Sequence, residues 1–169
     1  MTLISLLRAI MRSIDRLCLG LGLAAMLLML VCVCLQIVAR YVLNSPPAWT
    51  EELARYAMVW GAMLGATCAY YRRLDPTLSV LRPDLTRRQA LLRQIVETAA
   101  IALFIGPVLW FAPATVERLL DRPTETLGFS TGVIVAIIPV TMAIILLYAF
   151  VRIVLVLADQ DDFSKETGS

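Results

Sequence analysis

Apolar residues in this chain run in four long stretches separated by short polar segments. The first, Leu17 to Val38, has no charged residue, and the last, Thr126 to Val151, is the longest. Between them lie Thr98 to Val116 and Tyr56 to Tyr71, which reaches spanning length when Trp49 to Arg55 is added. A helix that crosses a bilayer needs about 20 mostly apolar residues. The pattern predicts an all-α integral membrane protein with four transmembrane helices, near residues 17–39, 49–71, 90–116 and 127–156.

The composition agrees with this pattern. Hydrophobic residues make up 60% of the 169 residues and the mean hydropathy is +0.80, whereas a soluble domain is about half apolar. A chain of this length is too short for more than one compact unit. We therefore expect a single four-helix transmembrane domain over residues 1–158 and a polar C-terminal tail over residues 159–169, which we expect to be disordered.

The segment before the first apolar stretch has a pattern of its own. Residues 3–16 place six apolar residues on one helical face and four charged residues on the other. This predicts an amphipathic helix that either lies on the inner leaflet or leads into the first span. The apolar stretch that follows is too long for a signal peptide, which favours a retained signal-anchor helix. The apolar face holds Leu3, Leu6, Leu7, Ile10, Met11 and Ile14, and the charged face holds Arg8, Arg12, Asp15 and Arg16.

The distribution of lysine and arginine predicts the orientation, although the formal net charge is only +2. Basic residues cluster before the first stretch, between the second and third, and after the fourth. Because cytoplasmic segments carry an excess of basic residues, we expect both termini and the middle loop in the cytoplasm. The clustered residues are Arg8, Arg12, Arg16, Arg72, Arg73, Arg82, Arg87, Arg88, Arg93, Arg152 and Lys165, and the other two loops hold Arg40, Arg118 and Arg122.

Residues that usually carry chemistry inside a membrane protein are scarce here. Histidine is absent, which excludes histidine-ligated haem, histidine metal sites and histidine acid–base catalysis. The four cysteines lie in apolar stretches without metal-ligand spacing, so we expect them to be small buried side chains. Glu97 is the deepest acid, and we expect it to snorkel or to be paired at the interface rather than to form a proton or cation site. The sequence therefore predicts no enzyme activity and no catalytic, cofactor or metal site.

The second stretch carries small residues at a spacing of four. Ala57, Gly61, Gly65 and Ala69 fall on one helical face. Small residues in such a row let another backbone approach closely, and in lipid this packing drives helix association. The row has two interpretations: packing within the protein's own bundle, or a surface for the helix of a partner.

Prolines and a capping pattern mark the helices of the second half. Thr86 to Gln89 matches a T-x-x-Q capping box, which predicts that the third helix begins near Thr86 and runs to about Val116. Proline inside a helix removes a backbone donor and commonly produces a kink. The candidate kinks are at Gly106-Pro107, Pro113 and Pro139.

A polar group interrupts the apolar pattern where the second helix begins. The segment PPAWTEELARYAMVW, residues 46–60, places Glu51 and Glu52 in the first turn, where the helix dipole favours anions, and Arg55 one turn after Glu51. An exposed pair at this spacing stabilises a helix by only about 0.2–0.5 kcal/mol. The group is therefore either ordinary interfacial capping, or a contact point with Arg40 or with the charges of a partner protein.

The same stretch carries a family resemblance. Residues 36–73, QIVARYVLNSPPAWTEELARYAMVWGAMLGATCAYYRR, resemble the signature of the small membrane subunit of tripartite ATP-independent periplasmic (TRAP) transporters, the DctQ-like or Q subunit. The matching elements are R-Y after the first span, W-x-E-E-x-x-R and W-x-x-x-L-G-A in the second, and its basic end. TLGFSTGVIVAIIPVTMAIIL resembles the family's last span, so the match covers nearly the whole chain. Where the family commonly has a histidine after the second span, this chain has Pro76, so the role of that histidine is not carried over.

The resemblance implies a scaffold rather than a pore. A Q subunit packs on a much larger M subunit that holds the sodium and substrate sites and moves by an elevator motion, and a periplasmic binding protein, the P subunit, delivers an organic anion. The implied location is the bacterial inner membrane, and the implied partners are M, P and membrane lipids, with no nucleic acid. The residues expected at a subunit interface or in a structural role are Arg40, Tyr41, Trp49, Glu51, Glu52, Arg55, Trp60, Gly61, Gly65 and Arg72.

Two other classes of small membrane protein fit the residues less well. A four-span proton-coupled multidrug exporter needs an acid inside its bundle, typically in the first span, and the first apolar stretch has none. A quinone- or haem-binding membrane anchor of a respiratory enzyme usually uses histidine ligands, and the sequence has no histidine.

Overall fold

The computed structural model describes residues 3–45, 47–72 and 87–166, and these are predominantly helical. Its elements are α1 (Leu3–Tyr41), α2 (Ala48–Arg72), α3 (Arg87–Leu120), α4 (Thr131–Val135) and α5 (Ile137–Glu166). The described residues contain no strand, only an isolated β-bridge between Pro123 and Ser130. The prediction of an all-α protein is therefore confirmed for the described part of the chain.

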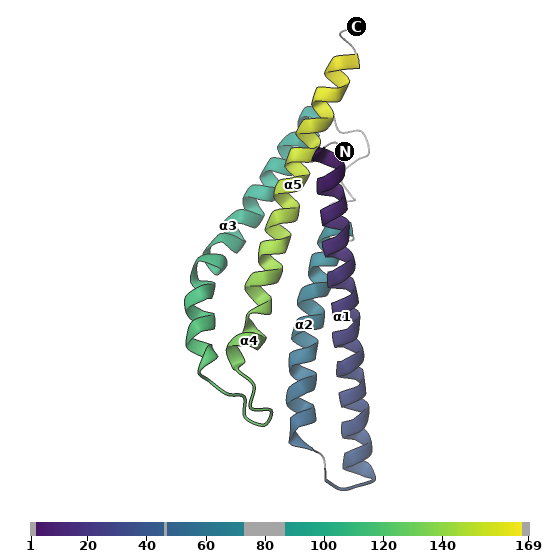
Figure 1. Cartoon of the computed structure of the whole chain (residues 1–169), viewed down its shortest axis with the longest axis vertical. Helices are drawn as coiled ribbons and strands as arrows, with labels where there is room; N and C mark the ends of the chain where they lie inside the picture. The colour runs from purple at the N-terminus through teal and green to yellow at the C-terminus, as the bar shows by residue number, and fades with distance from the viewer. Residues whose placement is uncertain (1–2, 46, 73–86, 167–169) are drawn as a thin grey trace.

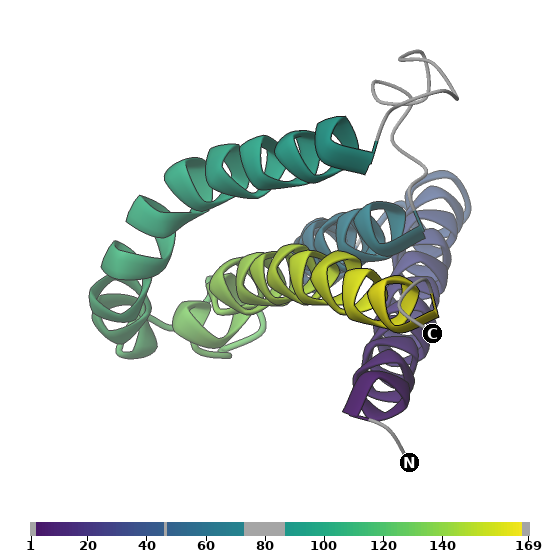
Figure 2. The same ribbon diagram turned by 90° about the horizontal axis from the view of Figure 1, so that it is seen from above.

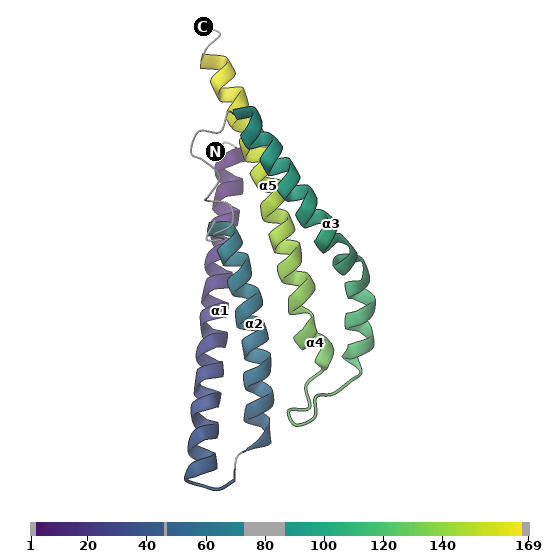
Figure 3. The same cartoon turned by 180° about the vertical axis from the view of Figure 1, so that it is seen from behind.

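The helices form an antiparallel hairpin with a second, more open pair beside it. Figure 1 shows α1 and α2 side by side over most of their length, with α5 against them and α3 on the outside. In Figure 3, the view from behind, α3 packs on α5 and α4 and bows away from the hairpin. One end of the bundle therefore holds the beginning of α1, the end of α2, the beginning of α3 and the end of α5.

The N-terminal amphipathic segment is part of α1. Because α1 runs unbroken from Leu3 to Tyr41, the segment leads directly into the first apolar stretch, and the alternative of a separate helix lying on the leaflet is wrong. At 1.5 Å per residue the 39-residue helix is about 58 Å long, well beyond a hydrocarbon core of about 30 Å. Asp15 does not face outward with the arginines as expected: it is buried, on the same face as Met11 and Cys18, because it has a partner on α2.

Three helical segments in the described residues are long and apolar enough to cross a membrane: Ser5–Tyr41, Leu91–Leu120 and Thr131–Leu155. The chain is thus a multi-pass membrane protein. The predicted second span forms α2 but is not one of these three segments. Its composition explains this, because α2 combines charged residues in its first turns with many alanine, glycine and aromatic residues.

The span predicted near residues 127–156 corresponds to the apolar segment Thr131–Leu155, but the helix begins later and ends later than expected. The chain first forms a turn, α4 begins only at Thr131, and the helix is interrupted at Ala136 before α5 begins. Pro139 explains the interruption, because it has no N–H to donate to the carbonyl of Val135. At the other end α5 continues to Glu166, which contradicts the expectation of a disordered tail up to that residue; extending an existing helix costs much less than starting one.

Prolines also shape α3. Pro107 and Pro113 both lie inside this helix, and Figure 2 shows it changing direction along its length, as predicted for proline kinks. The last turn of α3 meets α4 very closely: a Cβ added to Gly132 would lie 2.7 Å from the backbone nitrogen of Leu120. Only glycine fits at this contact. The proposed cap at Thr86 and the substitution at Pro76 both lie outside the described residues.

Candidate functional site

Glu52 binds a loop that is distant in the sequence. Its side chain, in the first turns of α2, is buried and accepts hydrogen bonds at both carboxylate oxygens. Oε1 accepts from the hydroxyl of Tyr56 at 2.8 Å and from the backbone N–H of Glu125 at 3.2 Å. Oε2 accepts from the backbone N–H groups of Thr126 at 2.9 Å and Leu127 at 3.2 Å, and from the Thr126 hydroxyl. One carboxylate thus binds three consecutive backbone N–H groups between α3 and α4.

The loop that presents these N–H groups is a tight turn with its own hydrogen bonds. The backbone N–H of Thr124 donates to the carbonyl of Phe129 at 2.8 Å, and the N–H of Phe129 donates to the Thr124 hydroxyl at 3.1 Å. Gly128 has φ +69°, a left-handed conformation that favours glycine. At the base of the turn the N–H of Thr131 donates to the carbonyl of Arg122 at 2.9 Å. The turn therefore leaves three donors pointing inward, and a carboxylate is a strong acceptor for such a set.

The other charged residues of the W-x-E-E-x-x-R segment face outward. Arg55 pairs with Glu51 at 3.3 Å, as predicted for the i,i+4 spacing, but both side chains are mostly exposed. Arg40 is exposed and forms no ion pair with any described residue. Tyr41 and Trp49 are also exposed. The polar group at the beginning of α2 is thus divided into a buried acceptor, Glu52, and exposed residues around it.

The middle of α2 contacts two other elements. The indole N–H of Trp60 donates to the carbonyl of Ile134 at 3.1 Å, which joins α2 to α4. Gly61 faces α1, where a Cβ on this residue would lie 3.0–3.2 Å from the side chain of Met26. A Cβ on Gly65 would meet no atom within 4 Å. The row of small residues is therefore split: Gly61 packs inside the hairpin, and Gly65 has open space beside it.

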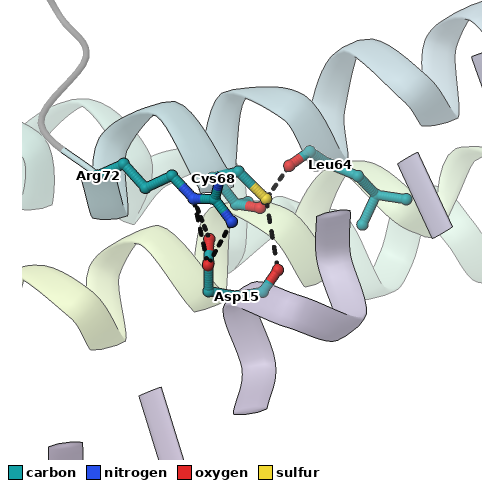
Figure 4. A network of polar contacts seen from close by, with 5 residues as sticks. Asp15, Leu64, Cys68 and Arg72 are labelled. Atoms are coloured by element: carbon teal, nitrogen blue, oxygen red, sulfur yellow. Dashed lines mark hydrogen bonds and ion pairs between the residues drawn. The ribbon is translucent and has the colours of Figure 1, made fainter. Parts of the chain in front are cut away.

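An ion pair between a buried carboxylate and a partly exposed arginine joins α1 and α2 near the other end. In Figure 4 the guanidinium of Arg72 points directly at the carboxylate of Asp15, with a distance of 2.8 Å between Nη2 and Oδ2. The Nε atom of Arg72 lies 3.3 and 3.2 Å from the two carboxylate oxygens. The thiol of Cys68 donates to the backbone carbonyl of Asp15 at 3.6 Å. Because the Asp15 side chain is only 7% exposed, Arg72 supplies the charge that keeps this carboxylate stable in the core.

Arg152 connects α5 to two other helices at the same end. Its Nη2 donates to the carbonyls of Tyr70 at 2.5 Å and Tyr71 at 2.9 Å, in the last turn of α2. The guanidinium also lies 4.5 Å from the centroid of the Tyr70 ring. The last carbonyls of a helix have no partner within it, so Arg152 acts as a cationic cap supplied by another helix.

The same arginine reaches α3. Its Nη1 lies 3.8 Å from Oε1 of Glu97, and both side chains are largely buried. The expectation that Glu97 would be paired is confirmed. Gln94 and Thr98, on the same face of α3, are also buried. Asp15–Arg72 and Arg152–Glu97, together with the bonds from Arg152 to the end of α2, link all four long helices at one end of the bundle.

The buried polar groups described above connect elements that are distant in the sequence. Glu52 joins α2 to the α3–α4 loop, and Trp60 joins α2 to α4. Arg72 joins α2 to α1, and Arg152 joins α5 to α2 and α3. Sequence reasoning missed the partners of Glu52 and Trp60, because they lie more than 70 residues further along the chain. It also missed the pairing of Asp15 with Arg72. Gly128, a residue type that is typical of turns, was the local feature of the sequence that could have indicated a defined turn in this loop.

Comparison with known proteins gives consistent matches. A family model described as "Tripartite ATP-independent periplasmic transporters, DctQ component" matches residues 29–159. A Haemophilus influenzae protein described as a TRAP transporter small permease protein is 35% identical over 77 residues, which is 46% of this chain and 45% of that protein. The sialic acid TRAP transporter small permease protein SiaQ of Vibrio cholerae is 26% identical over 129 residues, which is 76% of this chain and 73% of that protein.

Proposed function

Because the chain belongs to the DctQ family of TRAP transporter components, a family of transporter subunits and not of enzymes, we propose that it is a scaffold. In this proposal it binds and stabilises a large M subunit that carries out sodium-coupled uptake of an organic anion, which a periplasmic P subunit delivers. The observation that carries the proposal is the family match over residues 29–159. The structure supports it physically, because the buried charges described above bind other charges or backbone groups and hold elements of the chain together.

We further propose that α1, α2, α3 and α4–α5 cross the bacterial inner membrane as one domain, with both termini in the cytoplasm. The end of the bundle where α1 begins and α5 ends carries most of the described arginines. The opposite end carries the Glu52 loop and would face the periplasm. In this arrangement α2, the least apolar of the four, is sheltered along α1 and α5. The arginines at the cytoplasmic end are Arg8, Arg12, Arg16, Arg72, Arg93 and Arg152.

The proposed partner surfaces lie on the outside of this scaffold. Arg40, Tyr41, Trp49 and the Glu51–Arg55 pair form an exposed periplasmic rim, which we assign to contact with M or with docked P. Gly65 offers a place where a partner helix could approach α2 closely. In contrast, Glu52, Trp60, Gly61 and Arg72 act within the chain and shape the surface that the partners meet.

Co-expression with a large multi-span subunit encoded beside this chain tests the proposal. The wild-type chain should purify with that subunit as one complex, and Arg55→Ala should lower the yield of the complex. The charge-swapped variant Glu51→Arg/Arg55→Glu is the matched test, because it preserves the pair within α2 but reverses the charges offered to a partner. Normal complex yield and uptake in both variants would contradict a role for this rim in assembly. No complex with the wild-type chain would contradict the scaffold proposal itself.

A further inference from the structure

The outer face of the first part of α1 carries a row of arginines. Arg8, Arg12 and Arg16 follow one another at a spacing of four, and all three are exposed. Residues four apart lie on adjacent turns, about 6 Å apart along the helix axis, so the three positive charges form one strip. Arg55, Arg72 and Arg152 form ion pairs with acids of other positions, whereas Arg8, Arg12 and Arg16 form no ion pair with a residue whose side chain the structure describes.

The carboxylate that lies nearest to the strip in the sequence is turned away from it. Asp15 is next to Arg16 in the sequence, but it is buried and bound to Arg72 of α2. Met11 and Cys18 are buried on the same side of α1 as Asp15. The side chains that the structure describes therefore give the arginine strip no counter-charge, and they leave this side of α1 exposed.

An apolar surface continues from the strip along the same side of α1. Leu23 follows Arg16 by seven residues and Leu30 follows by fourteen, and a heptad drifts only about 20° around a helix. Both leucines are exposed, by 57% and 55%. Leu23 lies about 10 Å further along the helix axis than Arg16. This surface, which we call the arginine face, thus passes from positive charge to hydrocarbon over the depth of one lipid leaflet.

We propose that the arginine face of α1 binds anionic phospholipids, with the headgroup phosphate at Arg12 and Arg16 and an acyl chain along Leu23. A guanidinium group matches phosphate in charge and in bidentate geometry. Basic residues beside a membrane span attract anionic lipids. The apolar continuation favours a lipid over an acidic protein surface, because the exposed leucines complement a chain attached to the phosphate. The proposal rests on the proposed placement of α1 across the membrane, but it does not require the M subunit.

Native mass spectrometry of the purified chain in detergent tests this proposal. The probes are phosphatidylglycerol and phosphatidylcholine with identical acyl chains, titrated separately. We expect the wild-type chain to bind phosphatidylglycerol preferentially. Arg12→Gln/Arg16→Gln should weaken that binding by roughly 10- to 30-fold, since each arginine near the surface contributes about 1 kcal/mol. Arg12→Lys/Arg16→Lys should retain most of the binding, because it keeps the charge.

A matched control comes from the other end of the molecule. Arg118 and Arg122 are also exposed and four residues apart, so Arg118→Gln/Arg122→Gln removes the same charge elsewhere. This control should bind phosphatidylglycerol like the wild type. Absence of lipid preference in the wild type, or equal loss in the control, would overturn the proposal. An unchanged lipid preference in Arg12→Gln/Arg16→Gln would also overturn the proposal. If that variant kept its lipid preference but no longer purified with the M subunit, the arginine face would be a protein-binding surface. If the wild-type chain prefers phosphatidylglycerol but does not bind M, the lipid proposal stands and only the scaffold proposal is contradicted.

Discussion

The backbone N–H of Thr126 donates a hydrogen bond to the carboxylate of Glu52 at 2.9 Å, although the two residues are 74 positions apart. The contact fixes the loop between α3 and α4 against the first turns of α2. It also explains why the beginning of this helix holds two neighbouring acids with different surroundings. Glu51 is exposed and pairs with Arg55, whereas Glu52 binds the loop.

Replacing Glu52 should destabilise the loop more than replacing Glu51. Glu52→Ala leaves the N–H groups of Glu125, Thr126 and Leu127 without their acceptor, and unpaired buried donors are costly. We expect the melting temperature of the purified protein in detergent to fall by several degrees and cleavage of the loop by proteases to increase. Glu51→Ala is the control and should have little effect on either measurement, because exposed pairs contribute little. Equal effects of the two variants would contradict the assigned role of Glu52.

The two partners of the Asp15–Arg72 pair should respond unequally to mutation. Arg72→Gln leaves the buried Asp15 carboxylate without a counter-charge, whereas Asp15→Asn leaves an arginine whose side chain is 40% exposed and can reach water. Arg72→Gln should therefore lower the melting temperature more than Asp15→Asn. In the double variant the loss should be smaller than the sum of the two single losses, because the buried charge is then gone. Additive losses would show that the pair does not act as a unit.

Arg152→Lys should not substitute for arginine. A lysine retains the charge but cannot contact two carbonyls, stack on Tyr70 and face Glu97 at the same time. We expect a loss of about 1–2 kcal/mol in stability, measured by denaturation of the purified protein. Arg118→Lys, at an exposed arginine of α3, provides the comparison. If Arg152→Lys were as stable as the wild type, the capping role would be wrong.

Gly61→Leu and Gly65→Leu should have different effects on the stability of the isolated chain. At Gly61 the new side chain would displace Met26 from the α1–α2 contact, and overpacking of this kind costs about 1–3 kcal/mol. At Gly65 the isolated chain has room, so its melting temperature should not change.

Co-purification with the M subunit then tests Gly65 separately. If a partner helix packs there, Gly65→Leu should lower complex yield while leaving the isolated chain stable. Unchanged complex yield would mean that Gly65 faces lipid and would contradict its proposed place at a subunit interface.

The hydrophobic pattern predicts the helices well because apolar length and helical period are local properties. It placed the approximate positions of α1, α2 and α3, and it named Pro139, close to which the last helix is interrupted, as a candidate kink. It did not place the start of the last helix. The polar turn around Gly128 is short and lies beside a long apolar run, and the gap at Ala136 depends on a proline three residues later.

The polar contacts between helices were harder to predict than the helices. Because Asp15 is charged, it was predicted to lie on the same face of α1 as the arginines. Whether its side chain is buried depends instead on a partner from another helix, and that partner, Arg72, lies 57 residues away. The segment around Glu52 was identified from its residues, yet its partners come from a loop that no local pattern links to it. In contrast, the Glu51–Arg55 pair was predicted correctly because both residues lie on one helix.

The distance in sequence between Glu52 and its loop also constrains how the protein is made. A chain is synthesised from its N-terminus at roughly 5–20 residues per second, so Thr126 emerges about 4–15 seconds after Glu52. During that interval the α1–α2 hairpin is complete in length, but its buried carboxylate has not yet met the backbone donors that will hold it. The final geometry at this end of α2 is therefore set late in biogenesis, when the α3–α4 turn arrives.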